Sequence, residues 1–302
     1  MNDKDTGSGP MTALTSSVFL WGLTPVATKF ALTYTSANSL LFSRFLLTLV
    51  FGSILLKKVH LHGLTPRLIA GTFLLGICGV AIYQLLITSA LERMPASEAG
   101  IILGLEPILI QVIMLAHQRQ RLTLRNIVAL FLGLGGVIVV SLAGTKQGIS
   151  SNLLGVALAL LSAICWSIYV VASRNYTKVI GAFRYSVMSL TFGSLCIAAF
   201  VFTTDSSPNR IVPTHPAVLL ATIAFLSLFA TLGALMAWNY AAKFVSPQLQ
   251  GATLYAIPLI SCFGGALFLN EHLDSMFLIG VSAVLLSIHL SRSKTHQRRS
   301  FT

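Results

Sequence analysis

Long apolar stretches separated by short polar breaks run through the whole chain. Each is about as long as the roughly 20 helical residues that cross about 30 Å of hydrocarbon. Runs such as 126–143 and 217–238 are apolar on every side, whereas the strands of a β-barrel would alternate between apolar and polar residues. The pattern predicts an all-α membrane protein with ten transmembrane helices, near residues 12–31, 36–56, 69–89, 96–116, 126–143, 153–173, 183–203, 217–239, 247–269 and 275–291.

Composition supports this prediction. Of the 302 residues, 55% are hydrophobic and only 9% are charged, and the mean hydropathy is +0.83, which lies well outside soluble usage. The first ten residues are polar and lack a basic region before a short apolar core, so we expect no removable signal peptide. The four cysteines fall inside apolar stretches without a C-x-x-C pair, and we interpret them as packing residues, with no metal site and no cofactor.

The net charge of +12 reflects orientation in the membrane and does not indicate nucleic-acid binding. Basic residues gather in alternate loops, as in 57–67, 119–125 and 174–184, and again in 292–299. Such loops face the cytoplasm and attract anionic lipid. We therefore expect an integral multi-pass protein of a bacterial inner membrane, in contact with the lipid bilayer, with both termini cytoplasmic.

The chain contains an internal repeat. Trp21, Val26-Ala27-Thr28 and Lys29 match Trp166, Val171-Ala172-Ser173 and Arg174, and Ala90, Gly100 and Pro107 match Ala241, Gly251 and Pro258 at one constant offset. The predicted organisation is a tail (1–11), a first five-helix repeat (12–143), a linker (144–152), a second repeat (153–291) and a basic cytoplasmic tail (292–302). With five helices in each half, the second repeat must enter the membrane inverted, an arrangement that favours a transporter.

These features together resemble the drug/metabolite transporter superfamily, specifically its EamA-type ten-helix members, over nearly the whole chain. The resemblance lies in the order and spacing of short motifs: Leu20-Trp21-Gly22, Val26 to Lys29, Arg44-Phe45, Leu105-Glu106-Pro107, Tyr255 to Pro258 and Asn270 to Leu273. The chain departs from it at Arg119-Gln120-Arg121, where an acidic turn is often found.

The resemblance implies a secondary transporter of small metabolites that works by alternating access. We expect an exporter of amino acids, related metabolites or drugs, with proton coupling left open. An importer or exchanger in the same fold is the alternative. Because both repeats lie in one chain, a monomer could suffice.

Glu106 and Arg44 are the two ionisable groups expected deep in the hydrocarbon, where a charge requires a cavity or a partner. Glu106 could couple proton movement to transport, lock helix packing, or contact substrate. For Arg44 we favour a structural anchor over a substrate anchor, and a pair with Glu106 is open.

Pro107 and Pro258 interrupt two helices at matching points, and Pro25 is a third helix-break candidate. Paired interruptions point to a transporter's midplane site, here between the fourth and ninth helices, although a packing kink would explain them too. Polar and aromatic residues that could line this site, or else lie at the membrane interface, are Trp21, Tyr83, Gln84, Gln111, Trp166, Tyr169, Trp238, Asn239 and Tyr255. Lys29 and Arg174, at matching helix ends, are expected to snorkel to headgroups or to form gate contacts.

Two other classes of protein fit the sequence poorly. There is no His-Glu-x-x-His, no Gly-x-Ser-x-Gly and no pair of membrane aspartates, so we do not expect an enzyme. No sizeable soluble domain or selectivity-filter-like sequence supports a receptor or a channel.

Overall fold

The computed structural model describes most of the chain. The described residues are 8–59, 64–117, 124, 125, 127, 128, 131–133, 135, 136, 139, 152–204, 216–245, 253, 254, 256–270 and 275–291.

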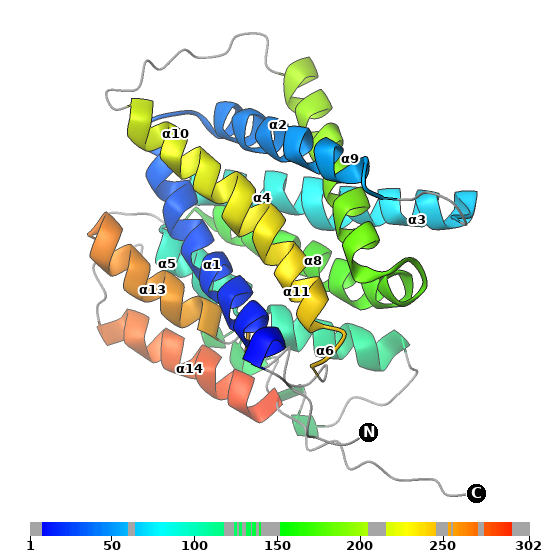
Figure 1. Ribbon diagram of the computed structural model, residues 1–302. Helices are drawn as coiled ribbons and strands as arrows, with labels where there is room; N and C mark the ends of the chain where they lie inside the picture. Colours follow the sequence, from blue (N-terminus) through cyan, green and yellow to red (C-terminus); the bar gives the residue numbers. More distant parts are fainter. Residues whose placement is uncertain are drawn as a thin grey trace, which may run out of the picture.

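Within this part of the chain all regular structure is helical, and none of it is strand. Figure 1 shows the elements packed as one bundle. They are α1 (Ser8–Leu32), α2 (Ala37–Leu56), α3 (Pro66–Gly76), the π-helix η1 (Ile77–Ile82), α4 (Tyr83–Leu91), α5 (Ala96–Leu103), α6 (Glu106–His117), α8 (Leu153–Ile180), α9 (Ala182–Thr204), α10 (Pro216–Ala224), the π-helix η2 (Phe225–Gly233), α11 (Ala234–Ala241), α13 (Ala256–Leu269) and α14 (Ser275–Ser291).

Six of the described helical stretches are long and apolar enough to cross a membrane, which supports an integral multi-pass protein. Three of the six are compound, because α3, η1 and α4 join, as do α5 and α6, and α10, η2 and α11. α13 and α14 are shorter apolar helices. Most of the predicted stretch 126–143, and residues 247–252 of another, lie outside the described residues.

Polar residues at the helix starts explain where several of these elements begin. The side chains of Ser36, Thr65 and Asn152 accept hydrogen bonds from backbone N–H groups in the first turns of α2, α3 and α8. α8 ends at Gly181, whose φ of +93° is a conformation that glycine adopts without strain, and α9 begins at the next residue. Large apolar side chains such as Phe19, Phe202 and Phe263 cover the outside of the bundle, as suits contact with lipid.

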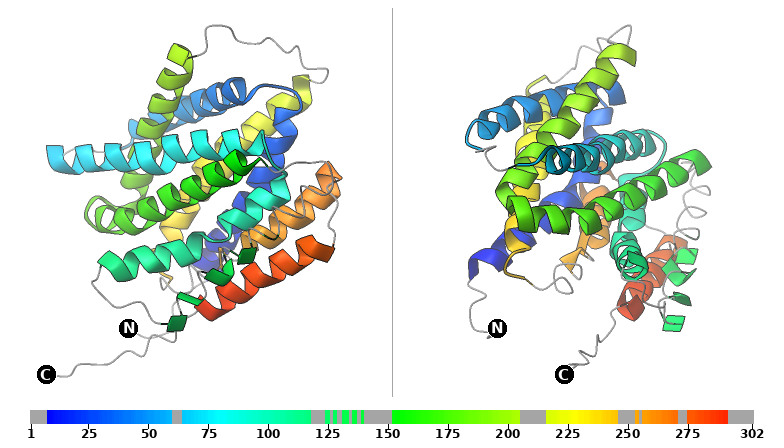
Figure 2. Two further views of the ribbon diagram at one scale, coloured as in Figure 1. Left: turned by 180° about the vertical axis from the view of Figure 1, so that it is seen from behind. Right: turned by 90° about the vertical axis from the view of Figure 1, so that its right-hand side faces the viewer.

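The helices of the two sequence halves interlock rather than forming separate domains. α1 packs on α11 and α13, and α8 packs on α4 and α6. α2 packs closely along α9, and the views from behind and from the side show these two helices crossing at one edge of the bundle (Figure 2). Each half therefore completes the core of the other.

Both of the third helical stretches contain a π-helical segment, η1 in the first half and η2 in the second. The Thr231 hydroxyl donates to the carbonyl of Leu226, five residues earlier, at 2.7 Å, in keeping with the wider turn. π-helical segments are frequent at functional sites because they redirect side chains within a helix.

Gly76 allows a close approach between α3 and α9. A Cβ atom added there would lie 2.6 Å from the backbone oxygen of Ser189, and backbone atoms cannot move aside as a flexible side chain can. The close contact between these two helices thus depends on glycine.

Replacing Gly76 with alanine should force α3 and α9 apart. We expect a loss of about 1–3 kcal/mol of unfolding free energy, the usual cost of overpacking a core. It can be measured as a lower unfolding midpoint in an SDS titration of the purified protein. Gly135→Ala is the matched control, because a Cβ at Gly135 meets no atom within 4 Å; equal effects of the two substitutions would contradict this account.

Candidate functional site

A cavity lies among the helices of both halves and holds about 60 Å³ of space open to the centres of water molecules. That is enough for several waters. Its lining comes from α1 (Trp21, Thr24, Pro25, Thr28), α2 (Arg44), η1 and α4 (Gly79, Val80, Tyr83, Gln84, Ile87, Leu91), α5 and α6 (Leu103, Glu106), α8 (Trp166), α9 (Leu190), η2 and α11 (Ala230, Thr231, Leu235) and α13 (Ile257).

Arg44 is the buried cation of this cavity, with only 2% of its surface exposed. Its Nε and Nη2 donate to the hydroxyl of Thr231 at 3.2 and 2.7 Å, and its Nη1 donates to Oε1 of Gln84 at 3.1 Å. These acceptors lie on η2 and α4, so the guanidinium links the third helical stretches of both halves. Because a guanidinium has five N–H groups, two remain without a described partner.

Glu106 is the buried carboxylic acid of the cavity and is 3% exposed. Its Oε1 is buried and makes no hydrogen bond among the described residues. No ion pair joins it to Arg44 in the described part of the chain, although Tyr83 lies close enough to interact electrostatically with both. A buried polar atom without a partner is costly, and such a group is satisfied when a proton, a water or a ligand group reaches it.

Aromatic rings form the wall beside these two groups. The rings of Trp21 and Trp166 meet edge to face with centroids 5.4 Å apart, and Trp166 lies 5.4 Å from Tyr83. The Trp21 indole N–H donates to the carbonyl of Ala230 at 3.0 Å, which fixes the ring against η2. The ring centroid of Trp238 lies 5.1 Å from that of Trp21. The wall can therefore hold a flat apolar group or a cation.

Seven of the residues singled out from the sequence line the cavity together: Trp21, Pro25, Arg44, Tyr83, Gln84, Glu106 and Trp166. α1 continues through Pro25 without ending there. Tyr169 and Trp238 support the aromatic wall from outside the lining, since Tyr169 stacks on Trp166 at 5.2 Å.

Two of the singled-out residues, Asn239 and Gln111, lie away from the lining. Asn239 donates to the Ser186 hydroxyl at 2.6 Å, a buried contact between α11 and α9. Gln111 is half-buried on α6. Tyr255 lies outside the described residues.

The proline pair occupies matching positions. Pro107 lies in the first turn of α6 after a break at Gly104 and Leu105, and Pro258 lies in the first turn of α13. Neither proline lines the cavity, but the residue before each does: Glu106 before Pro107, and Ile257 before Pro258. The interruptions thus lie at the cavity wall.

Sequence reasoning missed Thr231, which accepts two hydrogen bonds from Arg44. A lone threonine inside the apolar run 217–239 carries no signal of its own. The only available hint was indirect, because a buried arginine requires acceptors from some neighbouring helix. Thr24, also in the lining, carries no signal for the same reason, whereas Thr28 belongs to the repeated motif Val26 to Lys29.

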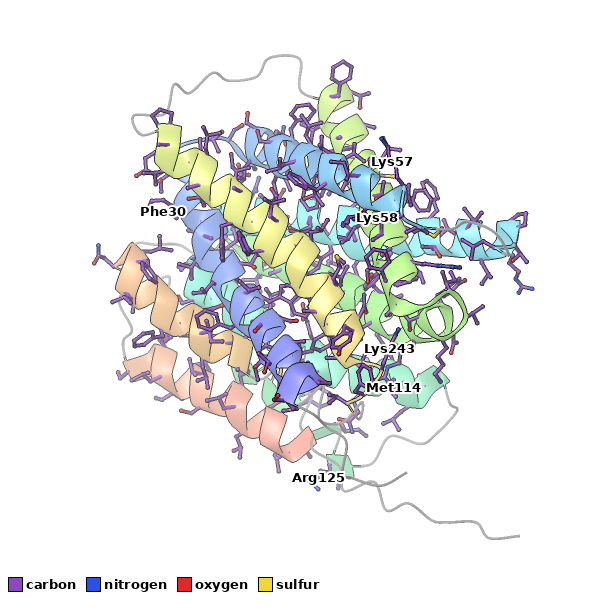
Figure 3. The ribbon with its side chains drawn as sticks, in the orientation of Figure 1. Phe30, Lys57, Lys58, Met114, Arg125 and Lys243 are labelled. Carbon is purple, nitrogen blue, oxygen red and sulfur yellow. The ribbon has the colours of Figure 1, made fainter. Side chains whose placement is uncertain are left out.

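Lys29 makes a contact within the protein. Its Nζ donates to the carbonyl of Leu91 at 2.6 Å, which connects α1 to the end of α4. Figure 3 labels the neighbouring Phe30 on the left of the bundle, Lys57, Lys58, Met114 and Lys243 toward the right, and Arg125 at the bottom. The labelled cations thus lie away from Phe30.

Nothing in the described residues groups three His, Cys, Asp or Glu side chains as a metal site would require. The site offers instead a cation, an acid and aromatic faces in one enclosed space. Such a set can bind a small organic molecule.

Comparison with known proteins assigns the family. The model of the EamA-like transporter family matches residues 8–142 and 153–293. An uncharacterized transporter of Archaeoglobus fulgidus is 24% identical over 283 residues, covering 92% of this chain and 96% of that protein. The aromatic amino acid exporter YddG of Ancylobacter novellus is 28% identical over 194 residues, covering 62% of this chain and 63% of that protein.

A solved crystal structure shares the fold, with a TM-score of 0.66 at 20% sequence identity, over 94% of this chain and 97% of that chain. The shared fold, the apolar helices and the family match all indicate the same assignment over nearly the whole chain. The chain therefore belongs to the EamA-like transporter family, within the drug/metabolite transporter superfamily, whose members are transporters and not enzymes.

Proposed function

We propose that this chain is a secondary-active transporter that exports small metabolites, with amino acids and related compounds as its cargo. The observation that carries the proposal is the cavity in which Arg44, Glu106 and the aromatic wall meet. The name of the Ancylobacter relative, an aromatic amino acid exporter, agrees with this cargo. An importer or exchanger using the same cavity is the alternative, and a receptor or channel is a weaker one.

The proposed mechanism is alternating access between two inverted five-helix repeats, residues 12–143 and 153–291, joined by the linker 144–152. Its support is a set of matching contacts: α1 packs on α11 as α8 packs on α4, and each half has a π-helical segment in its third stretch. Exchange of conformations between such halves would open the cavity to one side of the membrane and then to the other.

One pair of contacts supports the structural equivalence of the two halves in detail. The Ser227 hydroxyl donates to the carbonyl of Arg44 at 3.0 Å, where η2 meets α2. Gly76 lies against the carbonyl of Ser189, where α3 meets α9. The offsets that align the repeated motifs place Gly76 opposite Ser227 and Arg44 opposite Ser189, so the two contacts occupy the same place in the two halves.

Within the cavity, we propose that Arg44 binds a carboxylate of the cargo and Glu106 binds its ammonium group. The side chain of the cargo would pack against Trp21 and Trp166. Both charged groups lack an ionic partner in the described part of the chain, and a zwitterion supplies both. Glu106 can alternatively exchange a proton for the cargo, which would couple export to proton entry.

We place the protein in a bacterial inner membrane with both termini in the cytoplasm. The position of Lys57, Lys58 and Lys243 on the side of the bundle away from Phe30 supports this orientation (Figure 3). The expected partners are the lipid bilayer, a small organic substrate and protons. Since one chain supplies both halves of the cavity, a monomer suffices for this mechanism.

Substitution of Glu106 by glutamine tests its role in proton coupling. In proteoliposomes we expect wild-type protein to move protons when cargo is added, and Glu106→Gln to abolish this movement because the amide cannot take up a proton. A pH-sensitive dye inside the vesicles measures it. Glu98→Gln is the matched control, since Glu98 is a buried acid on α5 outside the cavity lining. Proton movement that persists in Glu106→Gln would show that Glu106 does not couple proton movement to transport.

Substitution of Arg44 tests carboxylate recognition. Stabilisation of the protein against heat should be screened with amino acids, with their decarboxylated amines and with the matching acids that lack the amino group. We expect Arg44→Gln to weaken binding of the two carboxylates about tenfold or more, because hydrogen bonds to charged groups are lost, and to spare the amines. Thr231→Val, which keeps the charge but removes its main acceptor, should weaken carboxylate binding less. Equal losses for amines and carboxylates would identify Arg44 as a packing anchor only.

A further inference from the structure

Lys29, in the last turn of α1, and Arg174, six residues before the end of α8, occupy matching positions of the repeat, yet their contacts differ. Lys29 follows Val26-Ala27-Thr28, and Arg174 follows Val171-Ala172-Ser173. Figure 3 labels Phe30, next to Lys29, and Met114, the contact of Arg174, at opposite ends of the bundle. The two cations therefore belong to opposite faces of the membrane.

On the first face, Lys29 connects two helices. Its Nζ donates to the Leu91 carbonyl at 2.6 Å, where α4 ends. The last carbonyls of a helix have no partner within the helix and carry partial negative charge, so a cation there is stabilising. Leu91 lines the cavity and is only 1% exposed. The contact therefore lies where it can close this end of the cavity.

On the second face, the equivalent connection is not made. The position that matches Leu91 is Ala242, the residue that follows α11, and it is exposed. The Nη1 of Arg174 lies 3.9 Å from the sulfur of Met114 on α6, a weak acceptor. α1 also packs on α4, whereas α8 and α11 do not pack closely among the described residues.

A second contact strengthens the first face alone. Oε1 of Glu92 accepts a hydrogen bond from the backbone N–H of Ala37 at 3.3 Å, which connects the end of α4 to the start of α2. The residue that matches Glu92 in the second half is Lys243, which is exposed. Its side chain contains no hydrogen-bond acceptor and so cannot make the equivalent contact. The two faces are thus built with unequal strength, and closure at Leu91 is the more stable one.

We infer that Lys29 and Arg174 are alternating gate residues of the transporter. In the described conformation Lys29 closes the Leu91 end of the cavity. In the opposite conformation Arg174 donates to the Ala242 carbonyl, and Lys29 releases Leu91. The physical reason is that inverted repeats exchange conformations, so a contact made by one half recurs at the matching place in the other. This inference depends on the alternating access proposed above.

Thiol labelling can test the exchange without any cargo. The four native cysteines are replaced by alanine, and a single reporter is introduced as Leu91→Cys or Ala242→Cys, which leaves the backbone carbonyl of each position in place. The protein is placed in nanodiscs, where a charged, water-soluble maleimide reaches both faces. The rate of labelling at Leu91→Cys then reports the population in which the first face is open.

Lys29→Met should raise the labelling rate at Leu91→Cys about tenfold and lower that at Ala242→Cys, because removing a hydrogen bond to a charged group shifts a two-state ratio by about this factor. Arg174→Met should lower the rate at Leu91→Cys several-fold, since it removes the contact that stabilises the opposite conformation. This second effect acts across the membrane, and a purely local packing role cannot produce it. Arg174→Lys retains a donor and should label as wild type.

Lys178→Met is the matched control, because it removes an exposed cation from the same end of α8. It should leave both rates unchanged. If Arg174→Met leaves the Leu91→Cys rate unchanged while the protein remains monodisperse, or if Lys29→Met changes Leu91→Cys without lowering Ala242→Cys, the exchange is refuted. Because no cargo is present, a negative labelling result is distinct from a failure of the transport assay.

Discussion

The burial of the Arg44 guanidinium within α2, a helix long and apolar enough to cross a membrane, is the constraint on which this structure depends. Arg44 can be held there only if neutral acceptors approach it from more than one side, and they come from Gln84 in one half and Thr231 in the other. The third helical stretches of both halves must therefore meet at α2. The cavity forms where they meet, because the same stretches contribute much of its lining.

Small residues make this arrangement compact. Gly76 and Gly193 each allow close approach between the first-half helix that contains η1 and the second-half helix α9. A lipid environment offers no hydrophobic drive between helices, so van der Waals contact over such surfaces is a main source of association. Tight packing at α2 and α9 contrasts with the open space among the aromatic rings.

Much of the fold was predictable from the sequence, because apolar runs of membrane-spanning length have few interpretations other than transmembrane helices. Predicted ranges such as 36–56, 96–116 and 183–203 coincide with observed helices. The cavity was partly predictable, because Arg44 and Glu106 are rare charges in apolar runs. The acceptor Thr231 and the Lys29 to Leu91 contact were not, since each depends on which helices meet, and hydropathy does not encode that. The π-helical segments also have no sequence signature here: Ile77–Ile82 reads as any apolar helix.

A π-helical segment takes up one residue more than an α-helical turn within nearly the same rotation about the helix axis. The residues beyond Ile77–Ile82 therefore keep their faces, so that Gln84 meets Arg44 and Leu91 meets Lys29. If the same residues wound as an ordinary α-helix, everything beyond Ile82 would turn by about 100°, the rotation that one residue adds to an α-helix. A change of winding with no change of sequence would then separate both contacts at once.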